Sequence, residues 1–332
     1  MGIWPIWVYE RYVEKHTTGF ERQRLLNPRG EFVGEDFLNI RIAYDPMPVW
    51  MELAAPMTLF AAMGFPDYVT LHHHDLSFRH LVFAYDTKAK RYRDDVISQL
   101  KEIKRWRTGN ALLNEFEGKL NFVTIVPYHG RSGLQNADVV TPGLGAEIRA
   151  TAKGRPVKYG NPSDTRRGTG IGASATVEYT PDMWPVVAGP VDPGGAADEA
   201  LYHELVHASR IVRGLADRMP VNKKYGDEEE YLAVLLANIY LSEKGQWVFR
   251  ANHDNGILLG PPAIGFLNNP QHVDMPPRRL IEDFHYSQPH FYDTLAHLPP
   301  DRPKYNWVRQ YHQEYIPSRQ ASRQITLPKL SH

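Results

Sequence analysis

The spacing of apolar residues predicts two adjacent helices in the middle of the chain. From 197 to 213, apolar residues recur at helical spacing without an interrupting proline or glycine, and Gly214 follows directly. We therefore expect a helix that ends at this glycine. A second helix is predicted from Asp227, because acidic residues fill its first turn and an apolar run follows them to Asn238.

Shorter apolar runs upstream of these helices predict strands and further helices. Residues 81–85 and 122–127 are predicted as strands. The helical spacing of apolar residues around Leu100 predicts an amphipathic helix that ends by 108–109, and residues 110–116 can cap and start a short helix. This mixture of helices and strands indicates an α+β fold.

Residues 173–179 alternate small or apolar with polar side chains, which predicts an edge strand. Such an edge can bind an extended peptide by main-chain pairing. The preceding residues 128–170 are rich in glycine and polar residues and are expected to form loops or hairpins around a cleft. Glycines 168, 170 and 172 lack the Lys-Ser/Thr pair and the following helix of a phosphate-binding loop, so we reject nucleotide binding.

The predicted helix at 197–213 carries the pentad H-E-x-x-H, from His203 to His207. Residues four apart lie on one face of a helix, so both imidazoles can reach a single metal ion. Glu204 can reach toward the same ion, where it would hold and deprotonate a water molecule. Two imidazoles, a general base and an open position for water form the arrangement of zinc metallopeptidases, so hydrolysis is the leading hypothesis.

A third ligand is expected from the acidic turn that begins the next predicted helix. Catalytic zinc sites usually combine three protein ligands with water, and residues 227–230 are four consecutive acids. Adjacent helix positions point about 100° apart, so these carboxylates cannot all face the two histidines. The pattern alone leaves open which glutamate does so.

The pentad, with Gly214 closing its helix, resembles the zinc helix of clostridial neurotoxin light chains. It is equally similar to that of NleD-type bacterial effector peptidases and of toxin domains on secretion-system spike and Rhs proteins. In that group the third ligand is the second glutamate of an E-E-x-x-[small]-[apolar] element, which residues 229–234 match. The resemblance therefore implies Glu230 as the third ligand of Zn2+ and Glu229 as a supporting acid, with Glu229 as the alternative ligand.

The resemblance covers about residues 77–260 and implies a zincin-like fold with a zinc helix, an acid-bearing helix and a small twisted sheet. In the related toxins an arginine, and then an aromatic or imidazole donor, follow the acid-bearing helix. Arg250 and His253 match this order and are our candidates for stabilising the oxyanion of peptide hydrolysis, with Tyr286 as a further candidate.

Composition narrows the classes of function. The 332 residues include 38 Lys and Arg and 38 Asp and Glu, and this balance gives no electrostatic footprint for nucleic acid or an anionic membrane. The lack of cysteine excludes disulfides and thiolate catalysis. No apolar run approaches the ~18 residues of a membrane span, and the first residues lack a Sec-type signal. We expect synthesis in the cytoplasm and export into a target cell by a dedicated secretion system.

We divide the chain at residue 75. Residues 1–75, rich in aromatic residues, Met and Pro, are expected to form a smaller N-terminal unit. Residues 76–332 are expected to form the zincin-like peptidase domain. Its Pro-rich part past 260 would wrap the domain, with short helices such as 305–315, and the tail 317–332 is expected to be mobile.

The motif predicts a zinc-dependent metallopeptidase that acts on a protein or peptide substrate, and the resemblance implies that it is a secreted bacterial toxin or effector. Its expected partners include a secretion-system component and a cognate immunity protein. One alternative is a zinc-containing, non-catalytic adaptor or scaffold of a secretion system, against which the intact Glu204 argues because a pure ligand set does not need that acid. Another alternative is a housekeeping peptidase of the producing cell.

Overall fold

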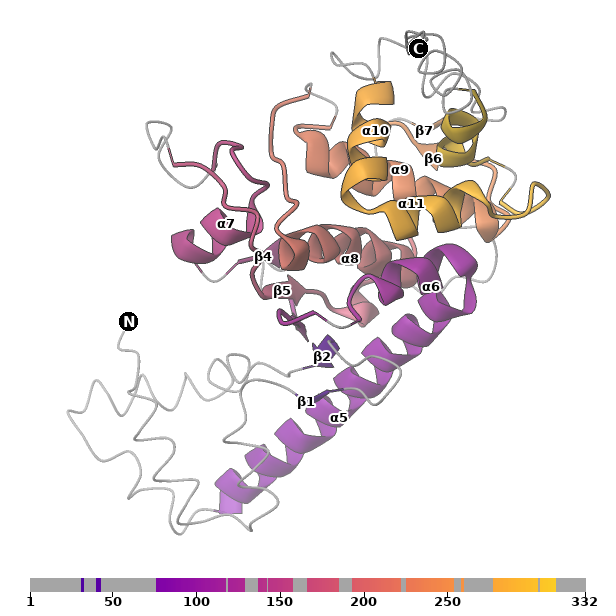
Figure 1. The fold of residues 1–332 in the computed structure, drawn as a ribbon. Coiled ribbons are helices and arrows are strands. Elements are labelled where there is room, and N and C mark those ends of the chain that lie inside the picture. The colour runs from indigo at the N-terminus through magenta and orange to yellow at the C-terminus, as the bar shows by residue number, and fades with distance from the viewer. Residues whose placement is uncertain are drawn as a thin grey trace, which may run out of the picture.

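The computed structural model has an α+β fold in which helices pack against a small sheet and against each other (Figure 1). It describes residues 31–32, 40–42, 76–117, 119–128, 137–141, 143–157, 166–184, 193–221, 225–253, 258–259, 277–303 and 305–314. The predictions for the tail 317–332, and for most of residues 1–75, lie outside these described residues.

The sheet is mixed and contains five strands in the described part of the chain. Its order is β1-β2-β3-β5-β4, with β2, β3 and β5 parallel and the two outer strands antiparallel to their neighbours. The strands are β1 Glu31–Phe32, β2 Ile40–Ile42, β3 Val123–Val126, β4 Asp138–Val140 and β5 Ala175–Glu178. β3 confirms the strand predicted at 122–127. β1 and β2 precede residue 75 and still join this sheet, while the division of the chain at that residue stays a prediction.

Two predictions about strands are wrong. Residues 81–85 belong to helix α5, Leu76–Arg105, rather than to a strand, because a short apolar run fits either element. The strand predicted at 173–179 forms as β5 but not at an edge, since β4 pairs along its outer side. Alternation shows that one face of a strand is buried and does not show the place of that strand in the sheet.

The helices follow the apolar spacing closely. α8, Ala197–Arg213, and α9, Glu228–Glu243, confirm the two central helices. α5 ends at Arg105, and α6, Arg107–Asn114, begins earlier than the short helix predicted at 110–116. The remaining elements are α7 Leu144–Ala150, the 3₁₀ helix η2 Pro181–Met183, the antiparallel pair β6 Phe249–Arg250 and β7 Leu258–Leu259, α10 Pro277–Ser287, α11 Pro289–Ala296 and a helical stretch at 307–314.

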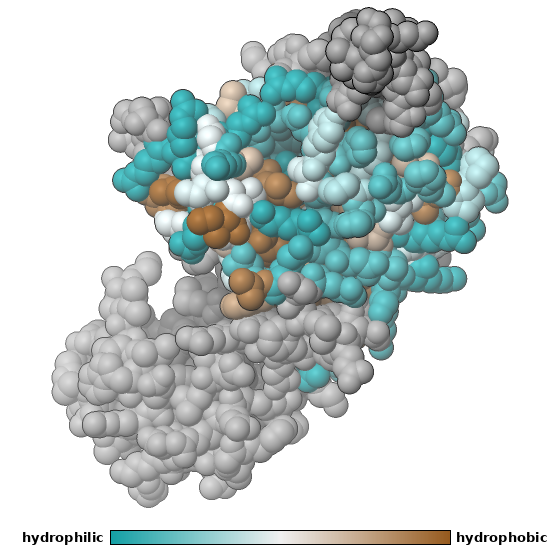
Figure 2. All heavy atoms as spheres, viewed as in Figure 1, coloured by the Kyte–Doolittle hydropathy of each residue, from teal (hydrophilic) through white to brown (hydrophobic). Residues whose placement is uncertain are grey.

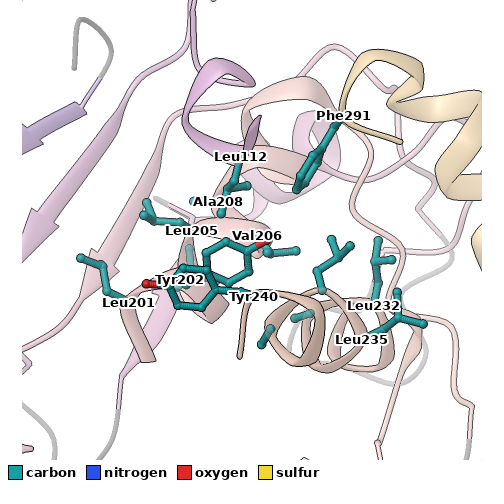
Figure 3. Close-up of a cluster of buried hydrophobic side chains, with 14 of the residues drawn as sticks. Leu112, Leu201, Tyr202, Leu205, Val206, Ala208, Leu232, Leu235, Tyr240 and Phe291 are labelled. Atoms are coloured by element: carbon teal, nitrogen blue, oxygen red, sulfur yellow. The ribbon is translucent and has the colours of Figure 1, made fainter. Parts of the chain in front are cut away.

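Helix α8 lies at the centre of the fold, where it contacts the sheet, α5 and α9 (Figure 1). Its side chains Leu201, Leu205 and Ala208 are fully buried (Figure 3). Tyr202 of α8 stacks on Tyr240 of α9, with ring centroids 4.5 Å apart. Because full burial of a large apolar side chain stabilises the fold by about 1.5–3 kcal/mol, these contacts fix the two helices firmly against each other.

The visible surface of the described residues is mostly hydrophilic (Figure 2). Apolar side chains gather on the side of α7 and the sheet, whereas the surface over α10 and α11 is mostly hydrophilic. Two of the exposed large apolar residues are Val140, on the outer strand β4, and Ile171, in the glycine-rich segment. Within the described ranges, no helix is long and apolar enough to cross a membrane.

The glycine-rich segment at 168–172 packs directly on the C-terminal end of α8. A Cβ atom on Gly172, whose φ is +92°, would lie 2.2 Å from the carbonyl oxygen of Val212. Gly214 ends α8 in the left-handed conformation with a φ of +69°, and a Cβ there would lie 2.4 Å from the carbonyl carbon of Gly170. Only glycine permits the backbone of this segment to approach the backbone at the end of α8 so closely.

Replacing Gly214 by alanine is expected to destabilise the protein more than the matched change Gly245→Ala. Both glycines follow a helix with positive φ, a conformation that costs about 1–2 kcal/mol for alanine. Nothing described lies within 4 Å of a Cβ at Gly245, whereas a Cβ at Gly214 would overlap the backbone of Gly170, which adds roughly 1–3 kcal/mol. Urea unfolding of both variants measures the difference, and equal losses of stability would contradict the packing argument.

Candidate active site

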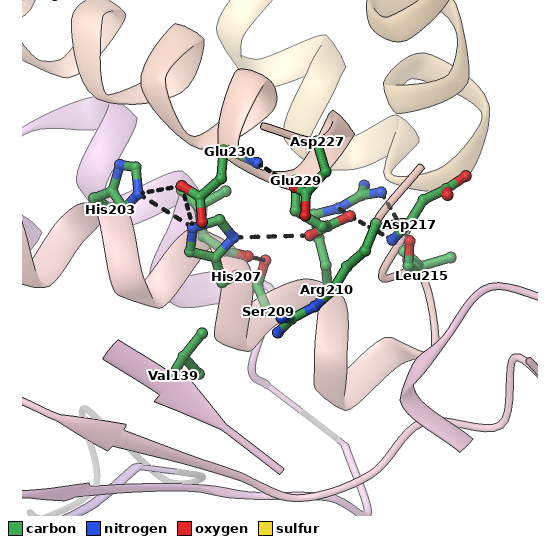
Figure 4. Close-up of polar contacts among 12 residues, drawn as sticks. Val139, His203, His207, Ser209, Arg210, Leu215, Asp217, Asp227, Glu229 and Glu230 are labelled. Carbon is green, nitrogen blue, oxygen red and sulfur yellow. Dashed lines mark hydrogen bonds and ion pairs between the residues drawn. The ribbon is translucent and has the colours of Figure 1, made fainter. Parts of the chain in front are cut away.

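Two imidazoles and one carboxylate meet between α8 and α9 (Figure 4). His203 and His207 lie about one turn apart on the same face of α8, and Glu230 lies in the first turn of α9. Glu230 Oε2 is 3.2 Å from His203 Nε2 and 3.4 Å from His207 Nε2, and the two Nε2 atoms are 3.1 Å apart. The backbone N–H of Glu230 donates to the carboxylate of Asp227, which caps α9.

These separations fit a bound metal ion. In a tetrahedral site, bonds of about 2.0–2.1 Å place neighbouring ligand atoms roughly 3.3 Å apart, and the three atoms here lie 3.1–3.4 Å apart. Among the described residues, His203, Glu230 and His253 also form a group whose ligand atoms lie within 4.8 Å of one another. Imidazoles combined with a carboxylate are a donor set that suits Zn2+.

Glu229 and Glu230 point to different sides of the first turn of α9. Glu229 accepts a hydrogen bond from Arg210 Nε at 2.7 Å and another from the backbone N–H of Asp217 at 2.7 Å. Its other oxygen is 3.9 Å from His207 Nδ1. Burial would raise the pKa of Glu229, but the charges of Arg210 and His207 hold it below the ordinary value. Of the two glutamates that the resemblance left open, Glu230 therefore lies against both Nε2 atoms, and Glu229 is anchored behind His207.

Arg210 is the centre of a buried polar network behind this cluster (Figure 4). Its guanidinium also donates to the carbonyl of Leu215 at 2.8 Å and to the side chain of Gln288 at 3.3 Å. Gln288 in turn donates to Glu115, at the end of α6, at 2.9 Å. Sequence analysis missed this network. Arg210 had a local sequence signal, because it is an arginine within a helix that has many apolar residues. Gln288 and Asp217 have no such local signal.

Burial and neighbouring charges together set the pKa values of the clustered groups, and although burial alone would lower the pKa of His207, Glu230 and Glu229 raise it. Burial lowers the pKa of His203 to about 3, so this imidazole is neutral and can offer a lone pair to a metal. Burial would raise the pKa of Glu230, but the adjacent imidazoles of His207 and His203 hold it below the ordinary value. Burial raises the pKa of Glu204 to about 7, which suits a group that accepts and returns a proton near neutral pH.

A cavity of about 370 Å³ opens beside the cluster. Glu204, His207 and Glu230 line it together with Asp138 and Val139 of β4. Figure 4 shows Val139 on the sheet side of His207. The outer strand and the clustered groups therefore line one cavity.

The structure brings two of the three oxyanion candidates to this cavity. Arg250, at the end of β6, is buried, and both Arg250 and His253 line the cavity. The side chain of Asn238 on α9 holds Arg250 by accepting from its N–H at 2.9 Å and donating to its carbonyl at 2.8 Å. Tyr286 is 64% exposed on α10 and is not among the residues that line the cavity.

Comparison with known proteins supports a peptidase. Residues 82–243 match the sequence model of the family Peptidase_M91, which is described as an effector protein. The matched part runs from within α5 to the end of α9 and includes His203, Glu204, His207 and Glu230, but it ends before Arg250 and His253. No curated protein and no solved structure gives a significant match. The match supports a peptidase of an effector family.

Removing the charge of Arg210 is expected to lower the stability of the fold strongly. In Arg210→Met, the buried carboxylate of Glu229 keeps its place without a cationic partner, and breaking a buried pair in this way costs about 3–5 kcal/mol. The control Arg91→Met breaks an ion pair whose side chains are 76% and 46% exposed, for which the loss should stay below about 1 kcal/mol. Chemical unfolding compares the two variants, and a loss for Arg210→Met as small as the control's would contradict an anchoring role for this pair.

Proposed function

We propose that the protein is a zinc-dependent metallopeptidase that hydrolyses peptide bonds in a protein substrate. The observation that carries this proposal is the convergence of His203, His207 and Glu230 at separations of 3.1–3.4 Å beside the half-buried Glu204. Two imidazoles and a glutamate are one of the usual ligand sets of catalytic zinc. The match to a family of peptidase effectors supports the same reaction.

The ion would be held by His203, His207 and Glu230. When bound, zinc supplies Lewis acidity, which polarises the scissile carbonyl and makes the attacking water more acidic. Glu229 supports this ligand set by its position behind the ring of His207, 3.9 Å from Nδ1. A carboxylate at that nitrogen favours the tautomer with the proton on Nδ1, which leaves the Nε2 lone pair free for the metal.

Glu204 is proposed as the general base. It lines the same cavity as the three ligands, and the rise of its pKa to about 7 through burial prepares its carboxylate to take a proton from the attacking water. The same carboxyl group then gives this proton to the nitrogen of the leaving amine. This transfer converts a poor leaving group into a neutral amine and completes the cleavage.

Arg250 is proposed to stabilise the oxyanion that develops on the scissile carbonyl. Its side chain is buried on the cavity wall, and its Nε has no hydrogen-bond partner among the described residues. A buried cation on the wall of a cavity can stabilise a negative charge that appears only during the reaction, which is where such a contact accelerates it most. His253 lines the same wall and stays a second candidate for this role.

The outer strand β4 is proposed to position the substrate. Asp138 and Val139 of this strand line the cavity, and in the described sheet β4 pairs on one side only, with β5. Its free edge can pair with the main chain of an extended peptide, which would bring one peptide bond beside Glu204. The role that we first assigned to residues 173–179 therefore passes to the neighbouring strand.

We further propose that the peptidase is delivered into a target cell by a secretion system, and that an immunity protein protects the producing cell. The description of the matched family as effectors supports delivery. A non-catalytic adaptor would have no use for an acid at position 204 in the cavity. A housekeeping peptidase would share the site but would not harm a cell that expresses it.

Glu204→Gln is expected to keep one zinc per chain and to lose peptidase activity by about 10²–10⁴-fold, because glutamine can neither take nor return the proton. Glu117→Gln, which changes an exposed glutamate outside the cavity, is the control and should match the wild type. Metal content and cleavage of a denatured protein substrate provide the two measurements. Activity that persists in Glu204→Gln would contradict the assigned base, and growth of cells that express each form separates a toxin from a housekeeping enzyme.

Glu230→Gln and Glu229→Gln are expected to affect different properties, the first zinc affinity and the second the stability of the metal-free protein. Glu230→Gln removes a proposed ligand, so its zinc affinity should fall by more than roughly 100-fold. Glu229→Gln leaves the ligands and weakens the pair with Arg210, so its main effect should be lower stability of the metal-free protein. Because zinc at 1,000 times its Kd adds about 4 kcal/mol to stability, chelation should lower the Tm of the wild type and change that of Glu230→Gln little. The opposite pattern would make Glu229 the ligand.

A further inference from the structure

Three imidazole nitrogens converge on one carboxylate oxygen. Glu230 Oε2 lies 3.2 Å from His203 Nε2, 3.4 Å from His207 Nε2 and 3.1 Å from His253 Nε2. The Nε2 atoms of His203 and His207 also face each other at 3.1 Å. A neutral imidazole has one N–H and one bare nitrogen, so two facing nitrogens can share only a single proton. A cation beside Glu230 Oε2 would satisfy the facing nitrogens of His203 and His207, and in the described part of the chain the ligand atoms of His203, Glu230 and His253 lie within 4.8 Å of one another.

His253 is set apart from the other two histidines by its exposure. Its side chain is 45% exposed, against 4% for His203 and 7% for His207. It therefore forms the solvent-facing side of the cluster, on the wall of the cavity that the substrate would enter. The separation of 3.1 Å between His253 Nε2 and Glu230 Oε2 also falls within the range found for the three proposed ligands.

The backbone of His253 is tied to the helix that carries Glu230. Asn238 of α9 holds the backbone of Arg250 through two hydrogen bonds, and the guanidinium of Arg250 donates to the carbonyl of His253. These bonds link position 253 to α9 through a short chain of contacts. The imidazole is thus presented to the cluster by a fixed backbone while its exposed ring keeps room to turn away.

We propose that His253 is a fourth protein ligand of the metal in the resting protein and that it must leave this place before a substrate is cleaved. The inference rests on the proposed function, because it concerns the same ion. Zinc sites with four protein ligands are closed and inert, whereas catalytic sites keep one position for water. His253 therefore acts as a latch on the site, and substrate that enters along the cavity competes with it.

The test measures metal binding rather than cleavage. Zinc affinity is determined by competition with a chromogenic chelator for the full chain, for His253→Ala, for His253→Gln and for the control His290→Ala, which removes an exposed histidine of α11. Visible spectra of the same proteins loaded with Co2+ report the number and kind of ligands. We expect His253→Ala and His253→Gln to bind one zinc about 10–100-fold more weakly than the wild type and to show shifted Co2+ bands, while His290→Ala is unchanged.

Two results would overturn the latch. An unchanged zinc affinity and Co2+ spectrum in His253→Ala would show that the imidazole is not a ligand. Wild-type behaviour of His253→Gln, whose amide can still donate to Glu230, would show that a hydrogen bond suffices. Thermal unfolding of the metal-free variants shows whether they are folded, which is expected because the His253 side chain is 45% exposed.

The proposed function can fail separately. If the wild type binds one zinc and the His253 variants bind it more weakly, but no protein substrate is cleaved, His253 is a ligand of a metal site that is not a peptidase. If Glu204→Gln abolishes cleavage while the His253 variants bind metal normally, the peptidase stands and the latch does not. If the wild type binds no metal, both fall together.

Discussion

The buried ion pair between Arg210 and Glu229 sets the rotation of α9 about its own axis. Consecutive side chains on a helix point about 100° apart, so anchoring one glutamate decides where the next one points. With Glu229 fixed on Arg210 Nε at 2.7 Å, Glu230 is turned toward the two imidazoles of α8. The stacking of Tyr202 on Tyr240 holds the same two helices together on their apolar side. The candidate site depends on both contacts, the ion pair between Arg210 and Glu229 and the stacking of Tyr202 on Tyr240.

Several acids are buried close to the candidate site. Glu229 and Asp217 are buried and pair with Arg210 and Arg155 at 2.7 and 2.8 Å, whereas burial raises the pKa of Glu228 to about 7. Glu230 is surrounded by imidazoles, which carry a full charge only when protonated. The proposed divalent cation would add positive charge beside Glu230, so it would stabilise the fold as well as serve the reaction.

The sequence predicts the central helices well because their signals are local. The pentad from His203 to His207, the acidic first turn and the closing Gly214 are each read from a few neighbouring residues. The choice between Glu229 and Glu230 could not be read from the helix pattern alone, because it depends on Arg210, a contact between residues 19 apart in sequence. The family resemblance implied Glu230, and the geometry agrees, while its role as a ligand stays a proposal.

Other features escaped prediction because they are set by distant parts of the chain. The strand β4 lies in a stretch with loop-like composition. It could not be predicted from its own residues, because it is defined by its pairing with β5. The apolar run at 81–85 is helical because it continues into α5. Gln288 reaches the network from the start of α11 without any local signal. Local patterns therefore predict the two histidines and the acidic turn, while long-range contacts set how these residues are arranged.

The short length of β4 has a consequence for target choice. Its three residues, Asp138–Val140, extend over only about 10 Å, so main-chain pairing along this strand would reach roughly three residues of a bound peptide. A footprint of that size cannot single out one protein among the many in a cell. If the proposed peptidase pairs its substrate with β4 in this way, its selectivity would have to come from contacts between enzyme and target beyond these three residues.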